Sequence, residues 1–317
     1  MLLLQYHNLL LQSILTERFA PDAQPASIDQ IISDFDNVTY HVSTPESKTK
    51  VLISLAVKCY KDLQKYGVDE RLKAMYGKYA ISTPEAGFDF SLVVDLEDLP
   101  PTQEEKDVLI QKIALLKRNA LAAPFEEAFS EFDELAAEAA KNSLDLSVPE
   151  ASNAEVKAIN YREEESIYIR ASFDRVTVIF STVFREETDR VFGKVFLQEF
   201  VDARKRAIQN APQVLYSSKE PPLEIRGLPG LRSSEDIGYI TFVLFPRHIT
   251  RDRRDTCISH IQIFRDYFHY HIKCSKAYMH SRMRFRVAEF LKVLNRAKPE
   301  VEEERKITAS GRRFGTR

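Results

Sequence analysis

Glycine and cysteine are scarce in this chain of 317 residues, which contains nine glycines and three cysteines. None of the glycines forms a GxGxxG loop or a GxxxxGK loop followed by Ser or Thr, so the backbone cradles that bind nucleotide phosphates are absent. Three cysteines without CxxC spacing favour small buried thiols over a disulfide framework or a zinc site. We therefore expect a cytosolic chain that binds no nucleotide and no cofactor.

Catalytic motifs are also missing. The sequence has no HExxH motif, and His269 and His271, two positions apart, would lie on different faces of a helix, which argues against a metal site. No glycine-flanked serine stands out as a nucleophile. The acidic clusters Asp34/Asp36 and Glu163–Glu165 could supply paired carboxylates, but they are more typical of solvated turns. We predict that the chain is not an enzyme; an unrecognised catalytic site is the least favoured alternative.

Long apolar runs are absent too, since no segment approaches the roughly 18 uninterrupted apolar residues needed to cross a bilayer. The first fifteen residues, MLLLQYHNLLLQSIL, lack a basic leader, and polar residues such as Gln5 and His7 interrupt them. This pattern indicates an amphipathic helix and predicts no membrane insertion.

Charge is divided unevenly along the chain although the net charge is only -2. From Pro246 onward there are 18 Lys or Arg against 8 Asp or Glu, whereas residues 1–245 carry 27 against 39. With 44% hydrophobic and 29% charged residues the chain is globular, and the basic C-terminal part predicts one acidic partner surface.

Apolar periodicity in the first half predicts a mixed set of elements. We expect two strands joined by a turn at residues 44–47, a helix broken at Gly67, another strand, and a long helix kinked at Pro124. An Ala-rich and acidic linker then leads to the second half. The predicted segments are, in order, Ile28–Ser43, Lys50–Tyr60, Lys61–Tyr76, Phe88–Leu96, Gln103–Leu135 and the linker Ala136–Asn153.

The second half repeats this order of hairpin, helix, strand and long helix. Its predicted strands are Val156–Tyr161, Ser166–Ser172, Arg175–Phe184, Gln213–Tyr216 and Gly238–Phe245, with a helix at Glu187–Ala207. We predict an α+β fold of two similar layered sheet-plus-helix domains followed by a long C-terminal helix. The predicted domains are residues 1–140 and 154–249, the helix covers 250–298, and a mobile tail covers 299–317.

The C-terminal helix is predicted because no proline or glycine lies between Pro246 and Pro299. A helix from Arg251 to Lys298 would be about 70 Å long. Apolar residues recur along it at steps of three, four or seven and form a seam. We expect the first half of the seam to cover the second sheet and the second half to bind a partner. The seam consists of Ile258, Ile261, Phe264, Phe268, Ile272, Met279, Met283, Val287, Phe290 and Leu294.

Away from the seam the helix is basic, with nine Lys or Arg and two acids from Arg265 to Lys298. A charged face is often merely solvated, but like charges at i,i+4 destabilise a helix, which favours an acidic partner. Aromatic residues between the basic ones leave open a nucleic-acid-binding module. We expect those aromatics, Tyr267, Tyr270, Tyr278 and Phe285, to lie mostly on or beside the seam, where packing competes with base stacking.

Several long runs resemble a known family. GYITFVLFPRH (238–248), FRDYFHYHIKCSKAYMHSRMR (264–284) and FLKVLNRAKPE (290–300) closely resemble the family of subunit 2 of the actin-related protein 2/3 complex, the actin-branching machine. The similarity covers nearly the full length. Long ungapped runs of this kind are more specific than any short motif.

The resemblance implies a scaffold role in the cytoplasmic, cortical actin cytoskeleton. In that family two similar domains precede a long helix that packs antiparallel on the helix of subunit 4, the core of a seven-subunit complex. The pair also contacts the side of the mother filament, so we expect subunit 4 and actin as partners and no nucleic acid. The partner-helix candidates are Phe268, Ile272, Met279, Met283, Val287, Phe290 and Leu294; the actin-filament candidates are Arg204, Lys205, Lys276, Arg282, Arg284, Arg286, Lys292 and Arg296.

Overall fold

The computed structural model describes residues 4–142, 154–231 and 234–296. Contacts within the chain divide it into a first unit, Met1–Tyr270, and a second unit, His271–Arg317. The predicted tail at 299–317 lies outside the described residues.

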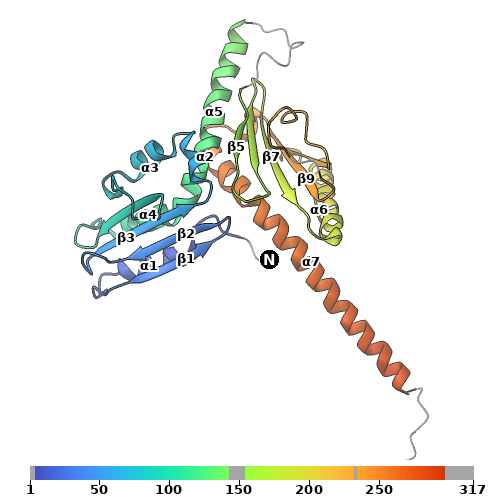
Figure 1. Cartoon of the computed structure of the whole chain (residues 1–317), viewed down its shortest axis with the longest axis horizontal. Helices are drawn as coiled ribbons and strands as arrows, with labels where there is room; N and C mark the ends of the chain where they lie inside the picture. The colour runs from blue at the N-terminus through green and yellow to red at the C-terminus, as the bar shows by residue number, and fades with distance from the viewer. Residues whose placement is uncertain (1–3, 143–153, 232–233, 297–317) are drawn as a thin grey trace, which may run out of the picture. The chain divides into compact units, whose positions relative to one another are not determined.

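A four-stranded antiparallel sheet opens the first unit, with the strands in the order β1-β2-β3-β4 (Figure 1). Alternation of apolar and polar residues in β2 buries Val38, Tyr40 and Val42 on one face. Tyr40 is paired with Leu55 of β3, and Leu55 with Phe90 of β4, so this face is continuous across the sheet. The strands are β1 (Asp29–Asp34), β2 (Val38–Ser43), β3 (Lys50–Val57) and β4 (Phe90–Asp95).

The turn between β1 and β2 corrects the prediction of a single strand at Ile28–Ser43. Asp36 and Asn37 have φ values of 66° and 55°, in the left-handed region. Asp and Asn tolerate this region better than other non-glycine residues, so they can reverse the chain without glycine.

The two edges of the first sheet differ. An isolated bridge between Ala80 and Leu92, together with a bond from the Ile81 N–H to the Ser91 carbonyl at 3.2 Å, covers the outer side of β4. Among the described residues, no backbone hydrogen bond closes the outer side of β1, where Ile31 is 71% exposed. The first sheet therefore has one covered and one open edge.

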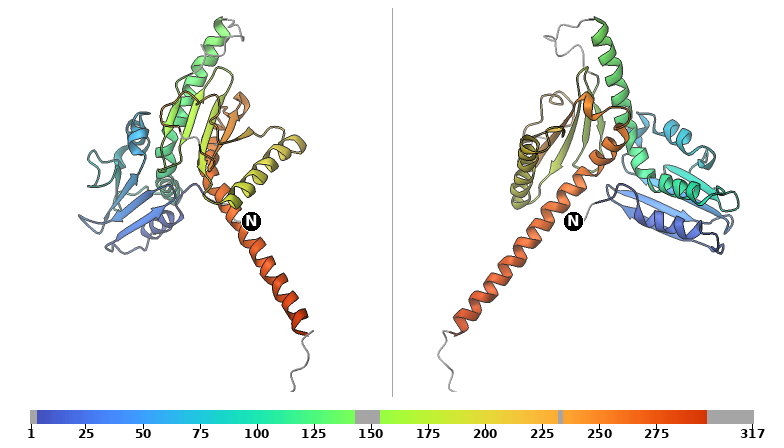
Figure 2. Two further views of the ribbon diagram at one scale, coloured as in Figure 1. Left: turned by 45° about the vertical axis from the view of Figure 1, so that its right-hand side comes forward. Right: turned by 180° about the vertical axis from the view of Figure 1, so that it is seen from behind.

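Helices accompany this sheet, and Figure 2 shows α1 and α4 against it. Gly67 has a φ of 70° and separates α2 from α3, which confirms the predicted break there. A capping box of Thr102 and Glu105 begins α4. The helices are α1 (Leu9–Arg18), α2 (Tyr60–Gln64), α3 (Val68–Tyr76), the 3-10 turn η1 (Gly77–Tyr79), α4 (Gln103–Ala114) and α5 (Leu116–Asn142).

The long helix predicted at Gln103–Leu135 is interrupted at Leu115, not at Pro124, which lies inside α5. Two contacts from distant segments stabilise this break. The Asn8 backbone N–H donates to the Ala114 carbonyl at 2.9 Å, and the Lys117 N–H donates to the Tyr40 hydroxyl at 3.2 Å. Each satisfies a terminal backbone group that the interrupted helices leave unpaired.

Residues 136–142, predicted as part of a linker, continue α5 instead. Their four alanines and one glutamate are strong helix formers, which outweighs the lack of an apolar face. The rest of the predicted linker, residues 143–153, lies outside the described part of the chain.

The second sheet has five antiparallel strands in the order β5-β6-β7-β9-β8. Phe180 of β7 and Phe242 of β9 lie on one face, where they pack against Phe264 of α7. On the opposite face, Ile179 and Tyr239 form a separate buried cluster with Ile225 of the loop that follows β8. The elements are β5 (Lys157–Ile159), β6 (Ile167–Ala171), β7 (Val176–Val183), α6 (Glu187–Arg206), β8 (Gln213–Ser218), β9 (Ile237–Leu244), η2 (Pro246–His248) and α7 (Arg254–Arg296).

These elements confirm the α+β class with two antiparallel sheets and a long C-terminal helix. Both halves follow the same order, with three strands as a meander, helix, strand and long helix, and β8 is an addition at the edge beside β9. The domain boundaries predicted from the sequence remain a proposal. The helix α7 is 43 residues long, which corresponds to about 65 Å.

Candidate binding surfaces

The start of α7 is held by an aromatic cluster in the first unit. Phe264 packs edge to face on Phe242 with ring centroids 4.6 Å apart, and Phe268 lies 5.6 Å from Phe196 of α6 and 6.1 Å from Phe184. Phe268 is fully buried. The first half of the seam thus covers the second sheet, as its spacing predicted.

A buried arginine joins α5 to the same part of α7. Arg118 is 4% exposed; its Nε donates to the Ser259 hydroxyl at 2.9 Å, and its Nη2 lies 2.6 Å from the Asp255 carboxylate. Gln262 in turn donates to the Arg118 carbonyl at 3.2 Å. These polar contacts fix the rotation of α7 about its axis.

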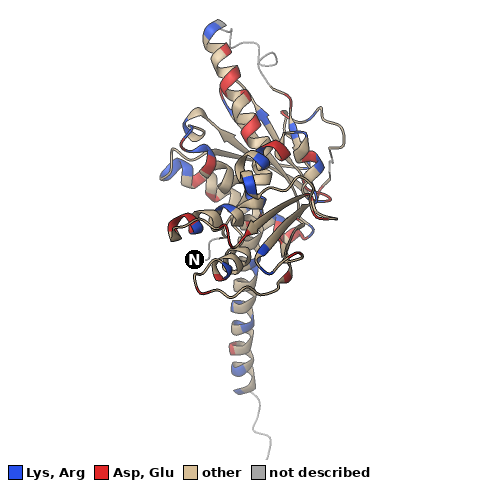
Figure 3. Cartoon of the chain, turned by 90° about the vertical axis from the view of Figure 1, so that its left-hand side faces the viewer, with Lys and Arg blue, Asp and Glu red and all other residues tan. Residues whose placement is uncertain are grey.

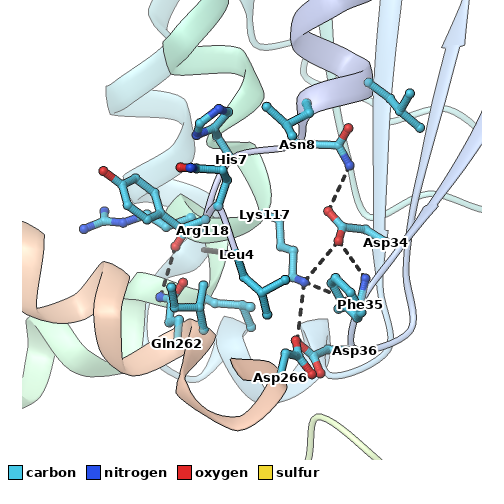
Figure 4. Close-up of a pocket in the computed structure, with 16 residues that line it drawn as sticks. Leu4, His7, Asn8, Asp34, Phe35, Asp36, Lys117, Arg118, Gln262 and Asp266 are labelled. Carbon is cyan, nitrogen blue, oxygen red and sulfur yellow. Dashed lines mark hydrogen bonds and ion pairs between the residues drawn. The ribbon is translucent and has the colours of Figure 1, made fainter. Parts of the chain in front are cut away.

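An ion-lined pocket of about 300 Å³ lies beside this joint, bordered by residues 4–10 and by the turn after β1 (Figure 4). The Lys117 ammonium is 3.6 Å from Asp34 and 3.4 Å from Asp36. Arg162 bridges Asp36 at 2.7 Å and Asp266 at 3.2 Å. The side chains therefore form one network of alternating charge.

Burial, followed by the nearby charge of Asp36, raises the pKa of Asp266 to about 6. Lys117, Arg162 and Arg265 oppose this rise. Every carboxylate named here has a cationic neighbour, and no serine, cysteine or threonine lines the pocket. The network is suited to holding segments together.

Residues 271–296, here called the C-terminal segment of α7, are different in character. Ile272 is 2% exposed, but the later seam residues are exposed. Their exposed fractions are 44% for Met279, 57% for Met283, 57% for Val287, 63% for Phe290 and 48% for Leu294. Of the seven candidate partner-helix residues, Phe268 and Ile272 are covered by this chain and five form an exposed apolar stripe.

Two of the four aromatic residues expected on or beside the seam, Tyr278 and Phe285, lie elsewhere on the helix. Tyr278 and Phe285 are each 62% exposed. Since successive residues of an α-helix turn by about 100°, Phe285 lies roughly 160° from Met283. These two aromatics face away from the seam, contrary to the expectation that they lie on or beside it.

The basic candidates occupy the remaining surface of this segment, which carries seven Lys or Arg and one Glu. Figure 3 shows these cationic residues in blue along α7. Arg282, Arg284, Arg286, Lys292 and Arg296 are exposed, and Lys276 is half-buried. Arg282 donates to the Tyr278 hydroxyl at 3.0 Å, and Lys292 pairs with Glu289 at 2.7 Å. Within the described part of the chain, Arg284, Arg286 and Arg296 form no ion pair with an acidic side chain.

The other two basic candidates lie in the first unit at the end of α6. Arg204 is half-buried, and its Nε donates to the Ala211 carbonyl at 3.1 Å, whereas Lys205 is exposed. Arg204 thus supports the chain that leaves α6.

Within the described ranges no three His, Cys, Asp or Glu side chains are grouped so that they could ligate a metal. No helix in that part of the chain is both long enough and apolar enough to cross a membrane.

Comparison with known proteins identifies related sequences over nearly the whole chain. The model of the family described as "Arp2/3 complex, 34 kD subunit p34-Arc" matches residues 53–301. The chain belongs to the p34-Arc family. It is 57% identical over 317 residues to the actin-related protein 2/3 complex subunit 2 of Schizosaccharomyces pombe, covering 99% of both chains. It is 39% identical over 315 residues to the subunit of that name from Dictyostelium discoideum, again with 99% of each chain covered.

The p34-Arc match begins within β3, so it includes β4, the second sheet and the whole described length of α7, whereas β1 and β2 precede it. It bears out the resemblance expected from the long sequence runs. What sequence reasoning missed in this p34-Arc chain is the ionic network, whose members Asp36, Lys117, Arg162 and Asp266 are far apart in sequence. The only local signal was the presence of Asp34 and Asp36 in a turn.

Proposed function

We propose that this chain is a non-catalytic scaffold subunit of the Arp2/3 complex in the cytoplasmic actin cytoskeleton, where branched filaments are nucleated. The observation that carries the proposal is the exposed apolar stripe from Met279 to Leu294, in a chain of a family described as a subunit of that complex. An exposed stripe of this size is a liability unless a partner covers it.

The stripe is proposed to pack antiparallel on the long helix of subunit 4. Its spacing of three and four residues matches the requirement for interlocking side chains between two helices. Burial of a fully exposed large apolar side chain contributes roughly 1.5–3 kcal/mol, and these five are about half exposed, so covering them favours pairing by several kcal/mol before the entropic cost of association. Phe268 and Ile272 are buried in the free chain, and they would hold the part of α7 that precedes the stripe.

The basic residues are proposed to contact the side of the mother filament. Their exposure and their excess over acidic neighbours suit an acidic protein surface. Contacts between exposed charges weaken as salt increases, because ions screen them over about 10 Å at 0.1 M. Filament binding should therefore fall as ionic strength rises.

The helix pairing is tested by changing Met283 and Phe290 to Asp together. Two buried carboxylates would have no partner across the helix pair, so co-purification with subunit 4 should be lost. The matched control is Ser281→Asp with Ala288→Asp, which places the same charge on exposed positions away from the stripe. Equal recovery of subunit 4 with both double variants would refute the pairing.

The filament contact is tested by reversing Arg282, Arg284 and Lys292 to Asp in the assembled complex. If each contact contributes about 0.5 kcal/mol, loss of the three should weaken filament co-sedimentation about tenfold, and repulsion adds to this loss. Branching should fall in parallel while assembly is unchanged. The control reverses the charge of three exposed lysines in the first unit by changing Lys48, Lys61 and Lys73 to Asp. Unchanged branching with the helix variant would sink the assignment.

A nucleic-acid-binding module is the alternative, and the outward position of Tyr278 and Phe285 favours it more than the sequence suggested, because stacking would not compete with the seam. A filter-binding titration with single-stranded RNA separates the two functions. Sub-micromolar binding that falls with salt would support the alternative.

A further inference from the structure

A second pocket, of about 550 Å³, lies between the end of α6, the end of β9 and the start of α7. Its floor is apolar and consists of Phe200, Phe242, Leu244, Ile261 and Phe264. Four of these five side chains are buried, and Phe200 is half-buried. A cavity of this size falls in the range of about 300–1,000 Å³ that is typical of ligand pockets.

The mouth of this pocket is basic. Arg253 lines it, with two histidines, His248 and His260, and no aspartate or glutamate is among its lining residues. Arg247 and Arg204 are close as well, since burial and then repulsion from Arg247, Arg204 and Arg253 lower the pKa of His248. The pocket therefore combines an apolar floor with a cationic rim.

His248 forms a fixed wall of the pocket. Its Nδ1 accepts a hydrogen bond from the Phe245 backbone N–H at 2.9 Å, so the proton lies on Nε2, which donates to the Asn210 carbonyl at 2.7 Å. Both ring nitrogens are used in the neutral form. The positive charge of the rim consequently comes from the arginines.

Arg253 is only weakly paired with an acidic group in this chain. Arg253 has a contact of 3.8 Å to Asp252 and a bond of 3.3 Å to the Arg247 carbonyl, and its side chain is 65% exposed. The Asp252 carboxylate also accepts a hydrogen bond from Thr250, which holds its pKa below the usual value. The rim thus keeps an uncompensated positive charge beside an apolar cavity.

We infer that this arginine-rimmed pocket is a docking site for an acidic segment of a partner protein that carries a bulky apolar side chain. The apolar side chain would fill the cavity, and the flanking carboxylates would pair with Arg253 and Arg247. A flat lipid surface reaches the rim but not the concave floor. Nucleic-acid bases require exposed aromatic faces, whereas Phe242 and Phe264 are each 7% exposed.

The test uses the full chain and a fluorescent eight-residue peptide of one tryptophan and one leucine with three carboxylate residues on each side. Fluorescence anisotropy should show saturable binding, and Arg253→Glu should weaken it about tenfold. The matched control is Arg251→Glu, which makes the same charge change at an exposed position that does not line the pocket. The same peptide with serine in place of its two apolar residues should bind at least about tenfold more weakly.

Cys257 provides a second measurement that does not depend on a variant. It lines the pocket and is half-buried, whereas Cys274 lies on the C-terminal segment of α7 and is exposed. Saturating peptide should slow alkylation of Cys257 by iodoacetamide and leave the rate for Cys274 unchanged. Equal protection of both thiols would overturn the site.

Three other outcomes also overturn the inference. These are the absence of saturable peptide binding, equal loss with Arg253→Glu and Arg251→Glu, and Arg253-dependent binding to phosphatidylserine vesicles or single-stranded RNA without binding to the peptide. The inference is independent of the proposed filament contact, because every residue varied here lies outside the C-terminal segment of α7. A negative result for the pocket therefore does not contradict the proposed filament contact, and a negative result for the filament contact does not contradict the pocket.

Discussion

Gly193 of α6 is a position where a single added methyl group should lower the stability of the fold. A Cβ at this residue would lie 2.9 Å from Cε1 of Phe184 and 3.0 Å from Cζ of Phe268. Gly238 also approaches the Phe184 ring closely, since a Cβ there would lie 2.9 Å from Cε2, so the ring has little room to move away. The Phe184 ring thus packs between Gly193 and Gly238. Phe268, which packs the start of α7 on the second sheet, is fully buried.

Two opposing effects set the result of Gly193→Ala. Alanine favours a helix over glycine by about 1 kcal/mol, whereas overpacking a buried contact costs about 1–3 kcal/mol. We therefore expect the free energy of unfolding to fall by up to about 2 kcal/mol, measured by urea denaturation of the full chain with an unchanged m-value. Lys194→Ala, at the exposed neighbouring position, is the control and should change the midpoint little.

A compensating variant makes this prediction sharper. Phe184→Leu removes the ring atoms that the new methyl group meets, so the double variant should be more stable than the sum of the single changes by about 1 kcal/mol. A stabilising Gly193→Ala with no coupling to Phe184→Leu would refute the reasoning. In that case the helix would have to shift freely against the sheet.

Two further predictions concern the polar contacts of α7. Because the folded chain raises the pKa of Asp266 from 3.8 to about 6, the stability that this carboxyl contributes is present below its ordinary pKa and is lost as pH rises through the folded value. Asp266→Asn should therefore flatten the fall in unfolding free energy between about pH 4 and 6, in urea titrations at a series of pH values; an unchanged slope would contradict it. Arg118→Met should lower the free energy of unfolding by about 2–3 kcal/mol through loss of its buried bonds to Ser259 and Asp255. Asp255→Asn, at an exposed carboxylate, should lower the free energy of unfolding by less than Arg118→Met does. A larger fall in melting temperature for Asp255→Asn than for Arg118→Met would contradict a stabilising role of the buried Arg118.

The long helix α7 was predictable because its signals are local. The absence of proline and glycine after Pro246 and the seam from Ile258 onward each required only neighbouring residues. The strands of the second sheet were found for the same reason, since β7 and β9 are short runs rich in apolar and β-branched residues. Exposure of Met283 and Phe290 also followed from the length of the helix compared with the sheet it covers.

The break at Leu115 was not predictable from local sequence. Pro124 is the stronger local signal, but Asn8 and Tyr40 bind the backbone groups that the break frees, and both come from segments more than seventy residues away. The ionic network was missed for a similar reason. Asp36 and Asp266 are separated by most of the first unit and meet only through Arg162.

The open outer side of β1 bears on how the isolated chain behaves at high concentration. Within the described residues the outer backbone groups of β1 beside the exposed Ile31 have no strand partner, and they form a template on which another copy can add a strand. Because the other edge of this sheet is covered, such pairing joins two copies through β1 and does not extend further along the sheet. Charged substitutions on this edge, such as Ile31→Lys, are therefore the rational first step in preparing a soluble sample of the chain.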